Sequence, residues 1–149
     1  MHKFIKGALL AFLVVGIFSG PAFAQMGVGL KIPAMEIFVS DRIAENTQVE
    51  AGVSISALLN SIIGLEVSGK KYFNPFDVGI QLQPYVGLEL TIAMVSGAIF
   101  FSPAALVGAE YHVGDTSFHI FAEATLGVAF GSLGIGIVPG GQLGARYDF

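Results

Sequence analysis

The sequence predicts an all-β protein: an up-and-down antiparallel transmembrane β-barrel of about eight strands that follows a cleaved signal peptide. Three observations predict it. The chain is 54% hydrophobic and only 12% charged, whereas a soluble surface usually carries about 25–35% charged residues. No stretch after Phe18 has the roughly 20 apolar residues of a membrane-spanning helix. Polar and apolar residues alternate with period two along most of the chain, which is typical of strands with two different faces.

The first 24 residues have the layout of a secretory signal peptide. A positively charged start is followed by an uncharged apolar run at residues 7–18 and by the small–x–small triplet at 22–24. The apolar run has about 12 residues, too few to cross a membrane as a helix. The alternative is an uncleaved inner-membrane anchor. We therefore expect a signal peptide over residues 1–24 and one domain over residues 25–149.

This domain is acidic and contains no cysteine. Lys3 and Lys6 belong to the signal peptide, so five of the seven basic residues remain beside all 11 acidic ones, and the net charge is near −6. That balance offers no basic patch for nucleic acid, so we expect no nucleic-acid partner. Without disulfides, an exported domain must be held together by core packing or by a membrane.

Eight segments of the domain alternate clearly between polar and apolar residues. In chain order they are Met26–Lys31, Met35–Ser40, Gln48–Ser56, Ile63–Lys70, Leu82–Met94, Ala105–Val113, His119–Phe130 and Gly141–Phe149. Eight is the smallest strand number of single-chain barrels of this kind, and most segments approach the length of about 9–11 residues that a tilted strand needs to cross a bilayer. Pro33, between the first two segments, marks either a tight turn or a break in one longer strand.

Alternation alone does not decide which face points inward. A soluble, lipocalin-like barrel would enclose the apolar face. Here the polar face is rich in glycine, which suits a crowded interior. These glycines are Gly27, Gly29, Gly52, Gly64, Gly87, Gly108, Gly127 and Gly144. We therefore expect the polar face to line the lumen and the apolar face to meet lipid.

The distribution of charge supports the same orientation. Eleven of the 16 charged residues in the domain lie on the polar face: Lys31, Glu36, Arg42, Glu50, Glu66, Lys70, Glu89, Glu110, Glu123, Arg146 and Asp148. The remaining five lie in turns or at strand ends: Asp41, Glu45, Lys71, Asp77 and Asp115. A charge that faced lipid in mid-strand would cost about 2–4 kcal/mol.

Aromatic residues gather near the expected strand ends, as they do at membrane interfaces. One rim carries Phe73, Tyr111, Phe118, Tyr147 and Phe149, and the other carries Phe130 together with Phe100 and Phe101.

The final stretch, Gly140 to Phe149, resembles the C-terminal strand of bacterial outer-membrane proteins, which ends in Phe after alternating apolar residues. Residues 83–87 (QPYVG) and 108–112 (GAEYH) resemble central strands of small eight-stranded outer-membrane barrels. The resemblance implies a monomer in the outer membrane of a Gram-negative-type envelope. It also implies contact with outer-membrane lipid, and recognition by the barrel assembly machinery through the strand that ends in Phe149.

The resemblance places the C-terminus on the periplasmic side and so divides the connections between strands. The periplasmic turns lie near Glu45–Asn46, Asn74–Pro75 and Asp115. The outer connections are expected at Leu58–Ile62, Val95–Ser102 and Gly131–Pro139. These are short and apolar, whereas many members of the family carry long polar surface loops.

Two histidines are the most conspicuous candidate site. If the turn Gly114–Ser117 closes a hairpin, His112 faces His119 inside the lumen, near Glu110 and Glu123. Two imidazoles with two carboxylates offer ligands for a transition metal. The alternative, which we favour, is a satisfied polar network that fills the periplasmic end of the barrel.

The other lumen charges are interpreted as structural. Lys31, Arg42, Lys70 and Arg146 are expected to pair with some of the seven lumen acids; the surplus of acids also suits a narrow cation-favouring pore. Lipid A deacylases and palmitoyl transferases are enzymes among small outer-membrane barrels that use a serine with a histidine and an acid. Here both histidines are expected at the periplasmic end, Ser117 lies in the turn, and Ser54 and Ser56 have no histidine at strand-pair spacing, so no such set is visible.

We therefore assign no catalytic, cofactor-binding or metal-binding residue. The sequence predicts a non-enzymatic integral outer-membrane barrel with a structural or surface-interaction role. The alternatives are a narrow, porin-like passive pore and a soluble periplasmic lipid-binding barrel.

Overall fold

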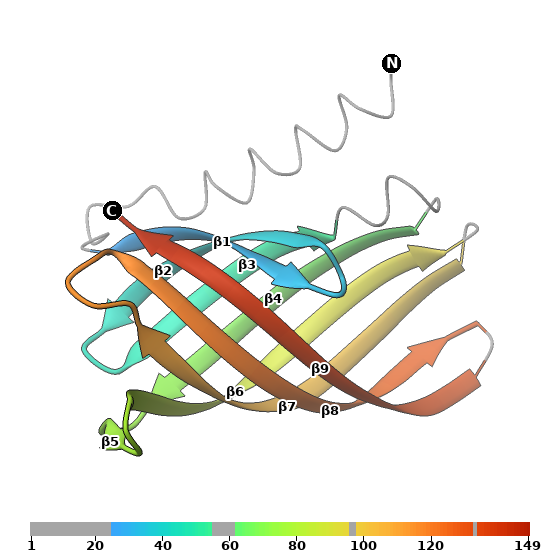
Figure 1. Ribbon diagram of the computed structural model, residues 1–149. Helices are drawn as coiled ribbons and strands as arrows, with labels where there is room; N and C mark the ends of the chain where they lie inside the picture. The colour runs from blue at the N-terminus through green and yellow to red at the C-terminus, as the bar shows by residue number, and fades with distance from the viewer. Residues whose placement is uncertain (1–24, 55–61, 96–97, 133) are drawn as a thin grey trace.

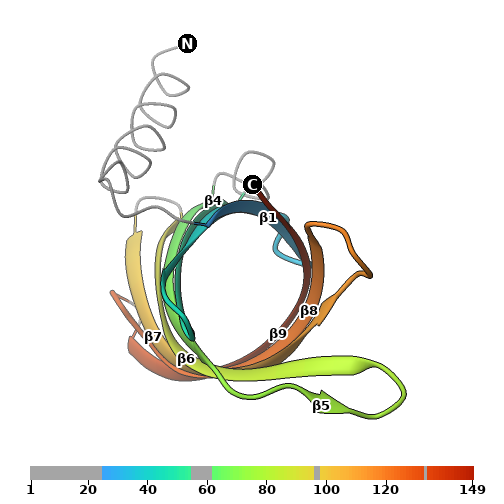
Figure 2. The same cartoon turned by 90° about the vertical axis from the view of Figure 1, so that its left-hand side faces the viewer.

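The protein folds as a closed antiparallel β-barrel in the computed structural model, which describes residues 25–54, 62–95, 98–132 and 134–149 (Figures 1 and 2). The wall consists of β1 (Met26–Ile32), β2 (Glu36–Ala44), β3 (Thr47–Ser54), β4 (Ile62–Tyr72), β6 (Gln81–Val95), β7 (Ala98–His112), β8 (Phe118–Gly131) and β9 (Gly134–Asp148). The two-residue strand β5 (Phe76–Asp77) pairs only with the start of β6 and is not part of the wall. The predicted signal peptide, residues 1–24, lies outside the described residues.

Strand pairing closes the sheet into a ring. Each wall strand pairs with its neighbour in the chain, and β1 also pairs with β9. Residues 62–72 of β4 pair with residues 85–95 of β6 across the gap left by β5. The predicted up-and-down barrel of eight strands is therefore confirmed. Within the described residues, no helix is long and apolar enough to cross a membrane.

Polar side chains fill the interior and apolar side chains cover the outside. Along β1, Lys31 has no exposed surface, while its neighbours Leu30 and Ile32 are exposed. On β6, Glu89 is buried and Leu88 is 72% exposed. The buried charged residues include Lys31, Glu36, Glu50, Glu66, Lys70, Glu89, Glu110, Glu123 and Arg146. The predicted orientation, with the polar face inward, is confirmed, and it inverts the usual pattern of a soluble protein.

The expected turns around Glu45–Asn46, Asn74–Pro75 and Asp115 all lie between strands, as predicted. Pro33 lies in the short connection between β1 and β2, where Lys31 pairs with Glu36. The structure therefore decides for a tight turn at Pro33 and against one longer strand.

Two of the expected outer connections are wrong. Instead of a loop over Val95–Ser102, β6 continues to Val95 and β7 begins at Ala98. Instead of a loop over Gly131–Pro139, β9 begins at Gly134, and Pro139 pairs with Leu126 of β8. These stretches are apolar on both faces, so alternation fails there although the strand ladder continues. Of the third expected connection, Leu58–Ile62, only Ile62 is described, and it begins β4.

Three large aromatic side chains inside the barrel each lie against a glycine on the neighbouring strand. Phe38 pairs with Gly29, Tyr85 with Gly108, and Phe121 with Gly144. A Cβ atom on any of these glycines would overlap the facing ring. The expectation that lumen glycines relieve crowding is confirmed at these positions, where the missing side chain leaves room for a buried ring.

Candidate functional site

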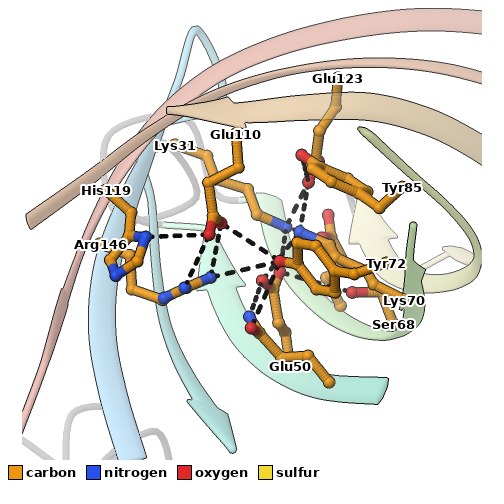
Figure 3. A network of polar contacts seen from close by, with 12 residues as sticks. Lys31, Glu50, Ser68, Lys70, Tyr72, Tyr85, Glu110, His119, Glu123 and Arg146 are labelled. Atoms are coloured by element: carbon orange, nitrogen blue, oxygen red, sulfur yellow. Dashed lines mark hydrogen bonds and ion pairs between the residues drawn. The ribbon is translucent and has the colours of Figure 1, made fainter. Parts of the chain in front are cut away.

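Two linked groups of charged side chains occupy the lumen (Figure 3). The first, which we call the lysine cluster, consists of Lys31, Glu50, Lys70 and Glu123 from four different strands. Glu50 lies between the two ammonium groups, with its carboxylate oxygens 3.2 Å from Lys31 Nζ and 2.8 Å from Lys70 Nζ. Lys70 also binds Glu123, which accepts a hydrogen bond of 2.9 Å from the hydroxyl of Tyr85. The cluster therefore ties β1, β3, β4, β6 and β8 together across the barrel.

The second group, the arginine cluster, consists of Arg146, Glu110, His119 and Asp148. The guanidinium of Arg146 donates two hydrogen bonds to Glu110, of 2.8 and 3.1 Å, and two to Asp148, of 2.6 and 3.2 Å. His119 lies between the two acids, 2.9 Å from Glu110 Oε1 and 3.1 Å from Asp148 Oδ2. Each carboxylate in this cluster therefore has a cationic or imidazole partner, as buried charges require.

Tyr72 joins the two clusters. Its hydroxyl lies 3.2 Å from Glu110 Oε2, and 3.3 Å from the side-chain oxygen of Gln48. Gln48 in turn donates a hydrogen bond of 2.8 Å to Glu50. The polar groups of the lumen therefore form one continuous network from the middle of the barrel to its C-terminal end.

Aromatic rings lie against the ammonium groups of the lysine cluster. Lys31 Nζ lies 5.1 Å from the centre of the Phe38 ring, and Lys70 Nζ lies 4.9 Å from that of Phe121 and 5.1 Å from that of Tyr85. The rings of Phe38 and Phe121 meet edge to face, with centroids 5.8 Å apart. The cations therefore contact the negative faces of aromatic rings as well as carboxylates.

The acids outnumber the cations toward the other end of the lumen. Lys31 binds Glu66 and lies 3.6 Å from Glu36 Oε1, which is too far for a hydrogen bond. Within the described part of the chain, Glu36 Oε1 and Glu89 Oε2 are buried without a hydrogen-bond partner. The expected pairing of lumen cations with lumen acids is confirmed for Lys31, Lys70 and Arg146. The guanidinium of Arg42 instead lies 5.2 Å from the centre of the Tyr72 ring.

The two predicted lumen histidines face each other as expected. His112 pairs with His119 across the β7–β8 hairpin, and their rings stack with centroids 4.5 Å apart. The expected position of Glu123 beside them is wrong, because Glu123 binds Lys70 and Tyr85 deeper in the barrel. His112 contacts the backbone oxygen of Thr116. No group of three or more possible metal-ligating side chains is found among the described residues.

The end of the barrel beside the C-terminus is hollowed. A cavity of about 420 Å³ opens there, and its lining includes Arg42, Gln83, His112, His119 and Asp148. This vestibule ends on the arginine cluster, since Glu110 also lines it.

Sequence reasoning placed most of these side chains on the lumen face but did not assign the tyrosines a role. Tyr72 continues the alternation of Glu66, Ser68 and Lys70 along β4, which was the available signal. Comparison with models of protein families, with curated proteins and with solved structures gave no match.

Proposed function

We propose that this chain is a non-enzymatic integral β-barrel protein of a bacterial outer membrane, with a structural or surface-interaction role, and that it acts as a monomer. One observation carries the proposal: most charged side chains of the wall strands lie inside the barrel, and most aliphatic ones lie outside. Leu88, at 72% exposed, and Lys31, at 0%, are the clearest examples.

The solvent that suits such a surface is a hydrocarbon. Apolar side chains exposed around a closed ring of strands leave no polar belt for water, and a closed barrel leaves no wall strand unpaired around its girth. Contact with acyl chains removes these side chains from water, which contributes about 25 cal/mol of favourable free energy for each Å² of apolar surface. A bilayer therefore stabilises the barrel as observed, whereas plain water favours aggregation of its outer face.

A role as a passive pore has less support. The lysine cluster and the rings of Phe38, Tyr85 and Phe121 occupy the middle of the lumen, and the arginine cluster lies between them and the cavity at the end of the barrel. Eight-stranded barrels are in general filled by side chains and do not form open channels. A lumen filled with side chains favours a function that is carried out at the outer surface of the barrel or at its two ends.

A soluble lipid-binding barrel also has less support, because such a protein needs an apolar interior to hold a lipid tail. The interior here carries buried charged side chains from all eight wall strands, among them Lys31, Glu50 and Arg146. Placing an acyl chain beside these groups would remove their charges from their partners at high cost.

Cell fractionation combined with gel migration tests the proposal. We expect the protein in the outer-membrane fraction, and we expect an unheated sample to migrate differently from a boiled one, because a folded barrel resists dodecyl sulfate until it is heated. Recovery of the folded protein in the periplasmic fluid, without detergent, would contradict the proposal. Substitution of Phe149 with Ala then tests the expected recognition by the barrel assembly machinery, since we expect less barrel in the outer membrane.

A further inference from the structure

A hairpin projects sideways from the barrel at the end that carries the C-terminus. It consists of residues 73–82 and includes β5 and the start of β6; Figure 2 shows it extending beyond the ring of strands. We call it the lateral hairpin. It contributes nothing to the lumen network described above, so its exposed side chains need a separate explanation.

The lateral hairpin has an apolar face and a polar face, which continue the outer and the inner face of β6. Phe76 pairs with Leu82, whose side chain belongs to the outward apolar face of β6, and Asp77 pairs with Gln81 on the other face. Three large apolar side chains of the hairpin are freely accessible: Phe76 is 46% exposed, Val78 65% and Ile80 49%. The apolar outer surface of the barrel therefore continues without a break onto one face of the hairpin.

The hairpin is held in a defined conformation. Gly79 has a φ of +94° and its N–H donates a hydrogen bond of 2.7 Å to the carboxylate of Asp77, which fixes the turn. At the base, the N–H of Phe73 donates a hydrogen bond of 2.9 Å to the backbone oxygen of Pro84. Its apolar side chains are therefore presented on a fixed scaffold.

We propose that the lateral hairpin docks onto the boundary between lipid headgroups and acyl chains, in the leaflet on the side of the C-terminus. This inference rests on the proposed membrane location. Two observations select lipid as the occupant. The apolar face of the hairpin is continuous with the surface proposed to meet lipid. The hairpin also lies at the same end as the aromatic rim formed by Phe118, Tyr147 and Phe149, whose rings contact one another in sequence at 5.0 and 5.5 Å.

The length of β6 gives the expected depth. Leu88 lies six residues along β6 from Leu82, the partner of Phe76, which is about 20 Å along the strand at roughly 3.3 Å per residue. With a strand tilt of about 40°, that is about 15 Å along the membrane normal. If Leu88 lies near the bilayer centre, Phe76 lies at the edge of an apolar band about 25 Å tall.

The absence of tryptophan from the whole chain allows a direct test. The full-length variants Phe76→Trp, Leu88→Trp and Asp115→Trp each carry a single indole, on the hairpin, at mid-wall and in the β7–β8 turn. After each folded variant is reconstituted in phosphatidylcholine vesicles, its fluorescence is measured with bromine placed near the glycerol end or near the methyl end of the acyl chains, and with aqueous acrylamide. Val78→Trp is the second hairpin variant, used if Phe76→Trp does not show heat-modifiable migration.

We expect the hairpin indole to be quenched most by the shallow bromines and to be protected from acrylamide. The Leu88→Trp indole should be quenched most by the deep bromines, and the Asp115→Trp indole should remain open to acrylamide. If Leu88→Trp is quenched by lipid but the hairpin indole responds only to acrylamide, the lateral hairpin stands in water, and this inference is wrong while the membrane proposal stands. If Leu88→Trp is not quenched by bromine either, the proposed membrane location fails first.

Discussion

Arg146 on β9 binds Glu110 on β7 through two hydrogen bonds of 2.8 and 3.1 Å, although β8 lies between their strands. The pair reaches over a neighbouring strand, so it stabilises the barrel as a whole and not one hairpin. Both residues are at least 97% buried, so very little of either charged group is exposed to solvent. The two hydrogen bonds run side by side from the planar guanidinium to the carboxylate, a bidentate arrangement that arginine can make and lysine cannot.

Removing one partner of this pair should destabilise the barrel strongly. We expect Arg146→Met to lower the free energy of unfolding by about 3–5 kcal/mol, because the carboxylate of Glu110 would stay buried without its cation. Urea unfolding in lipid vesicles measures the change. Lys71→Met, at an exposed lysine next to the buried Lys70, is the matched control and should leave stability almost unchanged. The double variant Glu110→Leu with Arg146→Met should lose less than the two single losses together; full additivity would mean that the pair is not coupled.

The contact between Gly144 and Phe121 predicts a second effect. Gly144→Val should destabilise the barrel by about 1–3 kcal/mol, because the new side chain meets the Phe121 ring inside a filled lumen. Gly69→Val is the matched control, since nothing lies within 4 Å of a Cβ at Gly69 on β4, and valine favours strands. The same unfolding assay compares the two, and equal losses would show that the lumen at Gly144 is not crowded.

A charge placed on the outer face of the barrel should lower its stability by an amount that depends on the depth of the residue in the bilayer. We expect Leu88→Lys to lower stability in vesicles by about 2–4 kcal/mol, and Ile43→Lys, near the end of β2, by about 0–1 kcal/mol. Both positions are exposed in the structure, so burial in protein does not distinguish them. A similar cost at the two positions would contradict a bilayer around the middle of the wall.

The filled lumen predicts an electrically silent protein. In planar bilayers at high protein density, we expect no discrete current steps, because the lysine cluster and its rings occupy the cross-section. Removal of two of these rings in the variant Tyr85→Ala with Phe121→Ala should produce small steps if the folded barrel survives, which heat-modifiable migration checks. Regular openings of the unaltered protein would contradict the interpretation of the network as a plug.

Period-two alternation predicted the barrel and its orientation because each strand in the middle of the wall separates a polar from an apolar environment. It failed where apolar residues occupy both faces of a strand. Ile99 to Phe101 and Ile135 to Val138 place apolar residues on both faces of their strands. The first residues of β7 and β9 therefore showed no alternation and were expected to be loops.

The membership of the network could be predicted, but its pairings could not. Alternation placed Lys70 and Glu123 on the lumen face, yet they are 53 residues apart and meet across the barrel. Such meetings depend on the stagger of the closed sheet, which no local pattern specifies. The hairpin register, in contrast, is local, and for this reason the stacking of His112 on His119 could be foreseen while the position of Glu123 could not.

The requirement of the folded state for lipid or detergent tests the central claim most directly. The purified protein is transferred from denaturant into buffer alone, into detergent micelles and into lipid vesicles, and its β-sheet circular dichroism and sedimentation are measured. The inverted surface predicts a folded monomer with heat-modifiable migration in micelles and vesicles, and aggregation in buffer alone. A folded, monodisperse monomer in buffer without detergent would contradict the claim that aliphatic side chains on the outside of this barrel meet acyl chains.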